Sequence, residues 1–213
     1  GEYEAMLSSL PEVEVGESLQ AIVGHLIQDL TNCLHTAGEV HTRKFDTTVF
    51  AAVSDRLTIF LRYLHIDNSV YSALFGQIYP LLQQALVLSR ENSYVVEKIC
   101  RSYKYAMRSM DQDFQPFLPS MTHHLAEEFA IAPIAAFLYG ASICVAEFGK
   151  PEDCSNNVLL VTMIQRMTAS FFSQFTSLEM FEKKPDIVEE FFYLMAKILT
   201  YSPLLFLQSQ QDT

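Results

Sequence analysis

Apolar stretches with helical spacing follow one another along almost the whole chain and are joined by short connectors. Asp46 and Pro185 stand at predicted helix starts. An aspartate there can cap the first turn with its side chain, and a proline there loses no hydrogen bond, because the first N–H groups of a helix have no partner within it. Gly149 follows an apolar stretch and is predicted to end it in the left-handed conformation. The 213 residues include seven Gly and eight Pro, which leaves little room for an all-β fold. We predict an all-α protein with helices over residues 17–35, 46–65, 69–89, 93–110, 114–129, 133–148, 155–177 and 186–201.

These helices form pairs that recur about every 40–47 residues, the period typical of HEAT repeats. The clearest pair reads IYPLLQQALVLSRENSYVVEKICRSYKYAMRSM (78–110), and Pro80 lies inside its first helix. Proline removes one backbone hydrogen bond there and bends the helix. We predict a HEAT-repeat solenoid, a right-handed superhelix fragment in which each of four antiparallel pairs has an outer (A) and an inner (B) helix. A closed helical bundle is the alternative. The approximate repeats are 17–65, 69–110, 114–148 and 155–201.

The two ends of the sequence resemble parts of further helices. Residues 2–10 have the pattern of a helix end, and residues 203–210 that of a helix start. Complete repeat arrays end in polar capping helices, whereas Leu204–Leu207 is apolar. The chain also begins with Gly1 instead of Met. We therefore expect it to be cut from a longer solenoid.

Composition excludes several classes of protein. The chain has 14 Lys and Arg against 25 Asp and Glu, a formal net charge of −11, whereas a general nucleic-acid binder should be basic. Half of the residues are hydrophobic, which argues against disorder, yet no apolar run reaches the ~18 residues of a membrane span. Glu2 and Glu4 stand where a signal peptide would be positive. Four cysteines without a CxxC pair favour buried thiols in a reducing compartment: Cys33, Cys100, Cys144 and Cys154.

Enzyme signatures are missing from the sequence. It contains no GxGxxG, P-loop, HExxH or GxSxG motif. The adjacent His123 and His124 point about 100° apart on a helix and cannot share a metal, so we interpret them as surface residues. Adjacent acidic pairs such as Glu127–Glu128 and Glu189–Glu190 are interpreted as solvated faces and not as catalytic dyads. We predict no enzymatic activity, no cofactor and no metal site.

One window departs from the acidic background. Residues 90–108 carry five of the 14 basic residues and two acids, a charge of +3 against −14 for the rest of the chain. At ~100° per residue, Arg101, Lys104 and Arg108 fall within an arc of about 60°. Arginine forks bind phosphate or carboxylate, so the pattern predicts recognition of anions. A solvated face, with Glu97 paired to Arg101, is the alternative. We call the candidate residues the basic stripe: Lys98, Arg101, Lys104 and Arg108.

Six segments, in this order, resemble the middle of the transportin-SR family of nuclear import receptors, within the importin-β (karyopherin) superfamily. They are VSDRLTIFLRYL (53–64), IYPLLQQAL (78–86), SYVVEKICRSYKYAMRSM (93–110), FLYGASICVAEFG (137–149), KPDIVEEFFYLMAKIL (184–199) and SPLLFLQSQ (202–210). The resemblance implies a receptor that binds phosphorylated arginine/serine-rich (RS) domains of splicing factors and shuttles between cytoplasm and nucleus. It also implies contacts with nucleoporins and release of cargo by Ran-GTP.

The family has an arginine-rich B helix that contacts the phosphorylated RS segment in an i, i+3, i+7 pattern. Here that pattern falls on Arg101, Lys104 and Arg108. Lys104 stands where an arginine is expected, and lysine keeps the charge but lacks the fork. The family's Ran-binding arches lie largely outside this segment, so we assign no Ran-contact residue. Two alternatives remain: a structural scaffold segment, and a related karyopherin that carries a different cargo. No direct contact with nucleic acid and no membrane insertion are expected.

Overall fold

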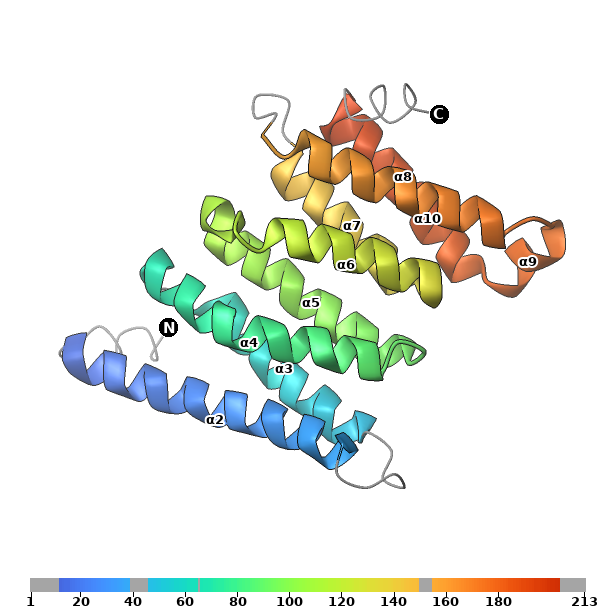
Figure 1. Cartoon of the computed structure of the whole chain (residues 1–213). Coiled ribbons are helices and arrows are strands. Elements are labelled where there is room, and N and C mark those ends of the chain that lie inside the picture. The colour runs from blue at the N-terminus through green and yellow to red at the C-terminus, as the bar shows by residue number, and fades with distance from the viewer. Residues whose placement is uncertain (1–11, 39–45, 65, 150–154, 204–213) are drawn as a thin grey trace.

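Eight of the helices form two layers, and the layers alternate along the chain (Figure 1). The computed structural model describes residues 12–38, 46–64, 66–149 and 155–203. The A layer consists of α2 (Glu12–Gly38), α4 (Asn68–Leu88), α6 (Leu118–Ile131) and α8 (Asn157–Gln174). The B layer consists of α3 (Thr47–Tyr63), α5 (Ser93–Met110), α7 (Ala135–Phe148) and α10 (Pro185–Tyr201). Two short elements lie between helices of the two layers: the 3₁₀ helix η1 (Asp111–Phe114) connects α5 to α6, and α9 (Leu178–Lys183) connects α8 to α10.

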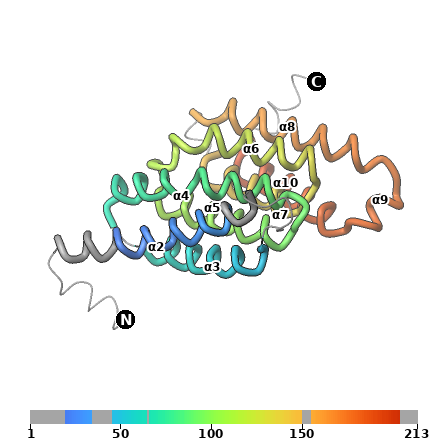
Figure 2. The backbone as a smooth tube through the Cα atoms, turned by 60° about the horizontal axis from the view of Figure 1, so that its bottom comes forward, coloured from blue at the N-terminus to red at the C-terminus, as the bar shows by residue number. Residues whose placement is uncertain are grey.

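Helices of one layer pack in chain order. In the B layer, α3 packs on α5, α5 on α7 and α7 on α10, while α6 packs on α8 in the A layer. Figure 2 shows the succession from the N-terminal helices in blue to the C-terminal helices in orange and red. No strand occurs among the described residues. The predicted all-α HEAT-like solenoid of stacked helix pairs is therefore confirmed. The exact limits of the four repeats stay a prediction.

One continuous apolar core runs between the two layers from α2 to α10. At its C-terminal end the rings of Phe171 and Phe191 stack with their centroids 3.9 Å apart and their planes 3° from parallel. In the middle, Gly140 allows α7 to approach its neighbours. A Cβ atom there would lie 3.2 Å from Leu125 Cδ2 and 3.6 Å from Cys100 Sγ. The close packing of α5, α6 and α7 therefore depends on this glycine.

Local signals explain most helix boundaries. The Asp46 carboxylate accepts hydrogen bonds from the backbone N–H groups of Thr48 and Val49, as an N-cap should. Pro185 is the first residue of α10, and Pro80 lies inside α4, as predicted. Gly149 follows α7, but its φ of −95° shows that the predicted left-handed closure is wrong. The helix ends there by a backbone bond from the Gly149 N–H to the Val145 carbonyl.

The limits of three predicted helices differ from the structure by three or more residues at one end or both. The helix predicted for 17–35 extends over Glu12–Gly38. The one predicted from residue 114 begins at Leu118, because Asp111 adopts a φ of +47° and a 3₁₀ turn follows. The one predicted to run to residue 177 ends at Gln174, and the short helix α9 that follows it was not predicted. These errors share one cause, since short irregular links carry little periodic signal.

Some expectations lie outside the described residues. They concern the partial helix at 2–10, the residues from 204 onward in the segment 203–210, and Cys154. Within the described ranges, Cys33, Cys100 and Cys144 are buried, which agrees with the interpretation of these three as buried thiols. No helix in those ranges is both long enough and apolar enough to cross a membrane.

Candidate interaction surface

Helix α5 carries the basic stripe and lies between α3 and α7 in the B layer. The Asn92 side chain caps its N-terminus by accepting the Val95 N–H. A hydrogen bond of 2.9 Å between the buried Thr58 and Ser102 hydroxyls joins α3 to α5. The apolar face of α5 is buried, and it comprises Val95, Val96, Ile99, Cys100, Tyr103, Ala106, Met107 and Met110. The opposite side of the helix is thus the one that can meet a partner.

Lys98 forms an ion pair that links two helices of the B layer. Its Nζ atom lies 2.6 Å from Asp55 Oδ1 on α3 and 2.8 Å from Asp55 Oδ2. The hydrogen bond to Asp55 raises the pKa of Lys98 above its usual value. The side chain is only 12% exposed. Of the four stripe residues, Lys98 is therefore the least available to a ligand.

Arg101 and Arg108 are exposed, and each also has a carboxylate partner. Arg101 Nη2 lies 2.7 Å from Glu97 Oε1, the pairing along α5 that the alternative interpretation expected. Arg108 Nε lies 2.9 Å from Glu147 Oε1 on α7. Surface pairs of this kind contribute little and exchange readily with another anion. Both arginines can therefore be recruited by a ligand that competes with these carboxylates.

Lys104 is held by aromatic rings and not by a carboxylate. Its Nζ atom lies 5.3 Å from the centroid of the Tyr105 ring and 5.8 Å from that of Tyr139 on α7. Arg62, at the end of α3, lies over the same Tyr105 ring at 5.4 Å and over Tyr63 at 5.0 Å. Within the described ranges, neither cation forms an ion pair. Sequence reasoning included Lys104 but missed Arg62.

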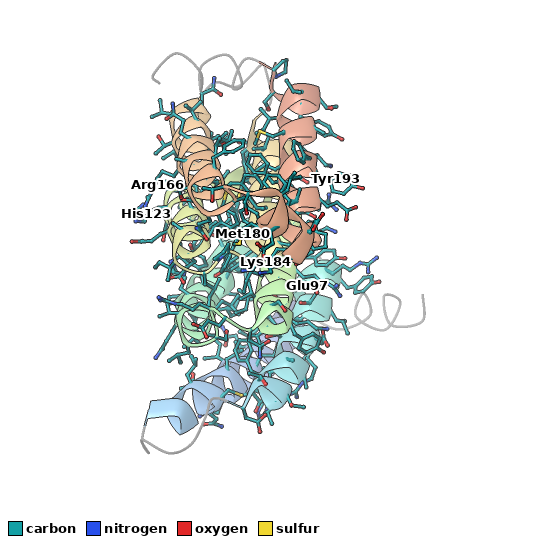
Figure 3. The ribbon with its side chains drawn as sticks, turned by 90° about the vertical axis from the view of Figure 1, so that its right-hand side faces the viewer. Glu97, His123, Arg166, Met180, Lys184 and Tyr193 are labelled. Atoms are coloured by element: carbon teal, nitrogen blue, oxygen red, sulfur yellow. The ribbon has the colours of Figure 1, made fainter. Side chains whose placement is uncertain are left out.

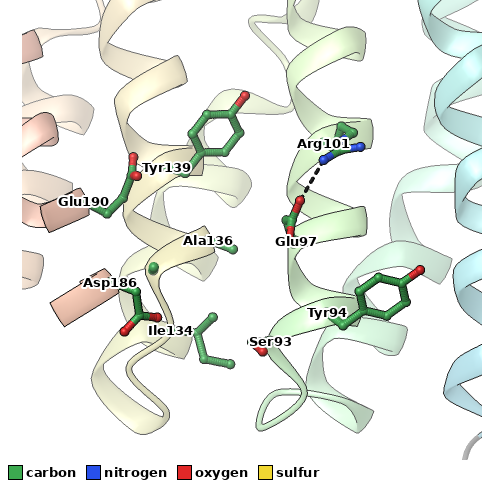
Figure 4. A pocket seen from close by; sticks show the side chains of 10 residues that line it. Ser93, Tyr94, Glu97, Arg101, Ile134, Ala136, Tyr139, Asp186 and Glu190 are labelled. Atoms are coloured by element: carbon green, nitrogen blue, oxygen red, sulfur yellow. Dashed lines mark hydrogen bonds and ion pairs between the residues drawn. The ribbon is translucent and has the colours of Figure 1, made fainter. Parts of the chain in front are cut away.

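A pocket of about 590 Å³ opens beside the stripe, between α5, α7 and the start of α10 (Figure 4). Tyr94 and Tyr139 form part of its walls, and three carboxylates line it: Glu97, Asp186 and Glu190. Burial raises the pKa of Glu190, and the neighbouring Glu189 raises it further. Arg101 also lines the pocket, so three carboxylates stand against one cation. The pocket therefore offers aromatic faces and an excess of negative charge, which together suit a guanidinium or ammonium group.

The opposite face of the molecule contains a different group of charged residues. In Figure 3, His123 and Arg166 lie on one side of the molecule, and Glu97 and Tyr193 on the other. His123 Nε2 lies 3.1 Å from Glu127 Oε2, and both side chains are exposed, as expected for surface residues. His124 is partly buried, and this burial lowers its pKa. The prediction that both histidines are surface residues is therefore right for His123 and only partly right for His124.

Glu128 corrects the prediction that the Glu127–Glu128 pair forms a solvated face. Its side chain is 4% exposed and pairs with Arg90, whose Nε atom lies 3.1 Å from Glu128 Oε2. Burial raises the pKa of Glu128 despite the arginine. Adjacent helical residues point in different directions, so one faces water and the other faces the α4–α5 connector. No group of three metal-binding side chains occurs in the part of the chain that the structure describes.

The geometry defines a helical-repeat array with a charged surface on its B layer. Residues 71–175 match the family model described as the Transportin-3/Importin-13 fourth TPR domain. TPR and HEAT repeats are both antiparallel helix pairs that stack into solenoids, so this match agrees with the fold.

Several similar proteins are named as importins or transportins. Importin-13 of Bos taurus is 22% identical over 97% of this chain and 23% of that protein. Importin-13 of Mus musculus is 27% identical over 64% of this chain and 14% of that protein. Transportin MOS14 of Arabidopsis thaliana is 24% identical over 73% of this chain and 16% of that protein. The chain thus spans about a fifth of the length of these relatives. The family model and these relatives agree with the resemblance to nuclear import receptors of the importin-β (karyopherin) type.

Proposed function

We propose that this chain is a segment of a nuclear import receptor and that its B-layer surface binds phosphorylated RS domains of splicing factors. The fold and the relatives named importin or transportin support the receptor role. In the whole receptor, the proposal includes shuttling between cytoplasm and nucleus, contacts with nucleoporins and release of cargo by Ran-GTP. The proposed role is to bind and carry proteins, and it involves no enzymatic step.

The observation that carries the cargo proposal is the presence of both signs of charge on one surface. The stripe on α5 presents Arg101, Lys104 and Arg108, and the pocket beside it contains Asp186 and Glu190. A phosphorylated RS segment alternates arginines with phosphates of about −2 charge each. Its phosphates suit the stripe, and its arginines suit the carboxylates and tyrosine faces of the pocket. An unphosphorylated RS segment is basic throughout and would meet the stripe unfavourably.

Binding of a labelled RS peptide to the 213-residue chain tests this proposal. We expect the phosphorylated peptide to bind at least about tenfold more tightly than the unphosphorylated one, because phosphate adds charge-assisted hydrogen bonds. Added salt should weaken the binding, since exposed charges are screened. Equal affinity for the two peptides would contradict the proposal.

The internal ion pairs of the stripe favour a second candidate, a receptor segment that carries a different cargo or serves as scaffold. Lys98, Arg101 and Arg108 already contact Asp55, Glu97 and Glu147. If these pairs persist in the presence of the phosphorylated peptide, Lys98, Arg101 and Arg108 stabilise the array and do not bind phosphate. Chemical shifts of the arginine side-chain N–H groups, followed during the titration, distinguish the two candidates.

A further inference from the structure

Arg62 and Lys104 differ from the other cations of α3 and α5. Arg56, Lys98, Arg101 and Arg108 each contact a carboxylate within 3.0 Å. Among the described residues, Arg62 and Lys104 instead have no carboxylate partner, and each lies over two tyrosine rings. A tyrosine ring attracts a cation but does not neutralise it, so the full positive charge remains available.

The two cations share one ring. Arg62 Cζ lies 5.4 Å and Lys104 Nζ lies 5.3 Å from the centroid of Tyr105. Arg62 also lies over Tyr63 and Lys104 over Tyr139, so two cations and three rings connect α3, α5 and α7. We call this arrangement the tyrosine ladder; it consists of Tyr63, Arg62, Tyr105, Lys104 and Tyr139.

The end of α3 that carries Arg62 is held in place by its neighbours. The Leu61 carbonyl accepts hydrogen bonds from the Tyr71 hydroxyl at 2.8 Å and from the Ser109 hydroxyl at 3.0 Å. Tyr71 belongs to α4 and Ser109 to α5, so three helices fix this end. The Arg62 side chain therefore starts from a rigid position, which reduces the entropy lost when it binds a ligand.

Two positive charges over one ring repel each other, and a multiply charged anion that contacts both removes that repulsion. A phosphate monoester carries a charge of about −1.5 to −2 and three acceptor oxygens at neutral pH. The arginine fork can take two of these oxygens, and the lysine ammonium can take the third without a fixed direction. This division of roles also accounts for a lysine at position 104, where charge is needed but a fork is not.

We propose that Arg62 and Lys104, held on Tyr105, form the primary docking site for a phosphorylated side chain of an extended peptide. Arg101 and Arg108 then act as secondary contacts, because a ligand must first displace Glu97 or Glu147. The assignment rests on the proposed binding of phosphorylated cargo. It adds a residue from α3 to a site that the sequence pattern restricts to α5.

Fluorescence anisotropy with the 213-residue chain and labelled RS peptides tests the assignment. Arg62→Gln and Lys104→Gln should each weaken binding of the phosphorylated peptide at least about tenfold, because each removes a charge-assisted contact. Arg101→Gln should weaken it about threefold, since its charge is already partly offset. Arg56→Gln is the matched control on α3, where Arg56 pairs with Asp29 at 3.0 Å, and should change the affinity less than twofold.

Further variants show whether charge or packing is responsible, and a further peptide shows whether phosphate is needed or carboxylate is sufficient. Lys104→Arg keeps the charge and should bind within about threefold of the unchanged chain, whereas Arg62→Lys keeps the charge but loses the fork and should bind with an affinity between those of the unchanged chain and Arg62→Gln. A peptide with aspartate in place of each phosphoserine should bind more weakly than the phosphorylated peptide, because carboxylate has less charge and fewer acceptor oxygens. Thermal unfolding of every variant shows whether the array stays folded.

The outcomes distinguish the two proposals. If the unchanged chain prefers the phosphorylated peptide but Arg62→Gln and Lys104→Gln behave like Arg56→Gln, the docking assignment is wrong and the proposed function stands. If the unchanged chain shows no preference for phosphate, both proposals are wrong. If the charge-conserving variants lose as much affinity as the glutamine variants, the tyrosine ladder supports packing and not phosphate binding.

Discussion

Helices α5 and α10 occupy the same layer, yet they present opposite charges. Each buries one apolar face, which includes Ile99 and Tyr103 in α5 and Phe191 and Leu194 in α10. The other face of α5 carries four cations, whereas the first half of α10 carries acids: Asp186, Glu189 and Glu190. Packing within the layer constrains the buried positions only. The exposed positions are free to specify a partner, and here they differ between two helices of one layer.

The two helices also differ in how their charges are balanced. Neighbouring helices supply Asp55 and Glu147 to the cations of α5. Glu190 of α10 has Glu189 beside it, and burial raises its pKa. Part of the α5 charge is therefore offset within the protein, and the carboxylates of α10 repel one another. A ligand with both signs of charge would neutralise the remaining positive charge of α5 and reduce the repulsion between the carboxylates of α10.

Reversing the charge of α5 should have the largest effect, because it makes α5 acidic, as α10 is. The triple variant Arg101→Glu, Lys104→Glu and Arg108→Glu should weaken binding of the phosphorylated RS peptide at least about 100-fold, since like charges would then face the phosphates. Peptide anisotropy measures the loss. Lys183→Glu on the exposed α9 is the control for a general change in net charge. Undiminished binding in the triple variant would exclude α5 as the cargo site.

Removing the one acid that pairs along α5 should have a smaller and opposite effect. Glu97→Gln releases Arg101 from its partner at 2.7 Å. We expect the phosphorylated peptide to bind about threefold more tightly, while α5 loses a few tenths of a kcal/mol of helix stability. The matched control is Glu91→Gln, an exposed position just before α5. Weaker binding of the phosphorylated peptide by Glu97→Gln would show that the Glu97–Arg101 pair orients the arginine for its ligand.

The smallest expected effect is on stability, concerns Glu190 of the acidic helix α10, and depends on pH. The folded chain raises the pKa of Glu190, so the folded state binds this proton more tightly than the unfolded state does. The ionised carboxylate therefore lowers stability above its folded pKa, and this cost disappears below its ordinary pKa.

Glu190→Gln should accordingly increase the free energy of unfolding by a few tenths of a kcal/mol at about pH 7.5, and the gain should vanish at about pH 4. Urea unfolding at the two pH values measures the difference. Glu182→Gln, at an exposed acid at the end of α9, is the matched control. A gain that persists at about pH 4 would mean that side-chain packing, and not charge, is responsible.

Periodicity was sufficient for most of the fold. Stretches such as 93–110 and 186–201 are amphipathic over four or more turns, so the sequence alone predicts the helices and, to within one residue, their limits. It missed the 3₁₀ turn after Met110 and the short helix Leu178–Lys183, because these elements are too short for a period. The acidic pair at 127–128 was misjudged for another reason, since burial depends on which neighbouring helix covers each residue.

The candidate site was predicted in part. Helical geometry alone places Arg101, Lys104 and Arg108 on one narrow arc. It cannot show that Glu147 reaches Arg108, because these residues are 39 positions apart and meet only when α7 packs on α5. The same applies to Arg62, which meets Tyr105 across the interface between α3 and α5.

The sequence by itself determined the helices, the all-α class and the positive face of α5, because these follow from the spacing of apolar and charged residues along one helix. The tertiary structure decided which charges are offset, which are held on tyrosine rings and which carboxylates line the pocket beside α5. Contacts between helices depend on register and on the rotation of each helix about its axis. Only the packed array sets these two quantities.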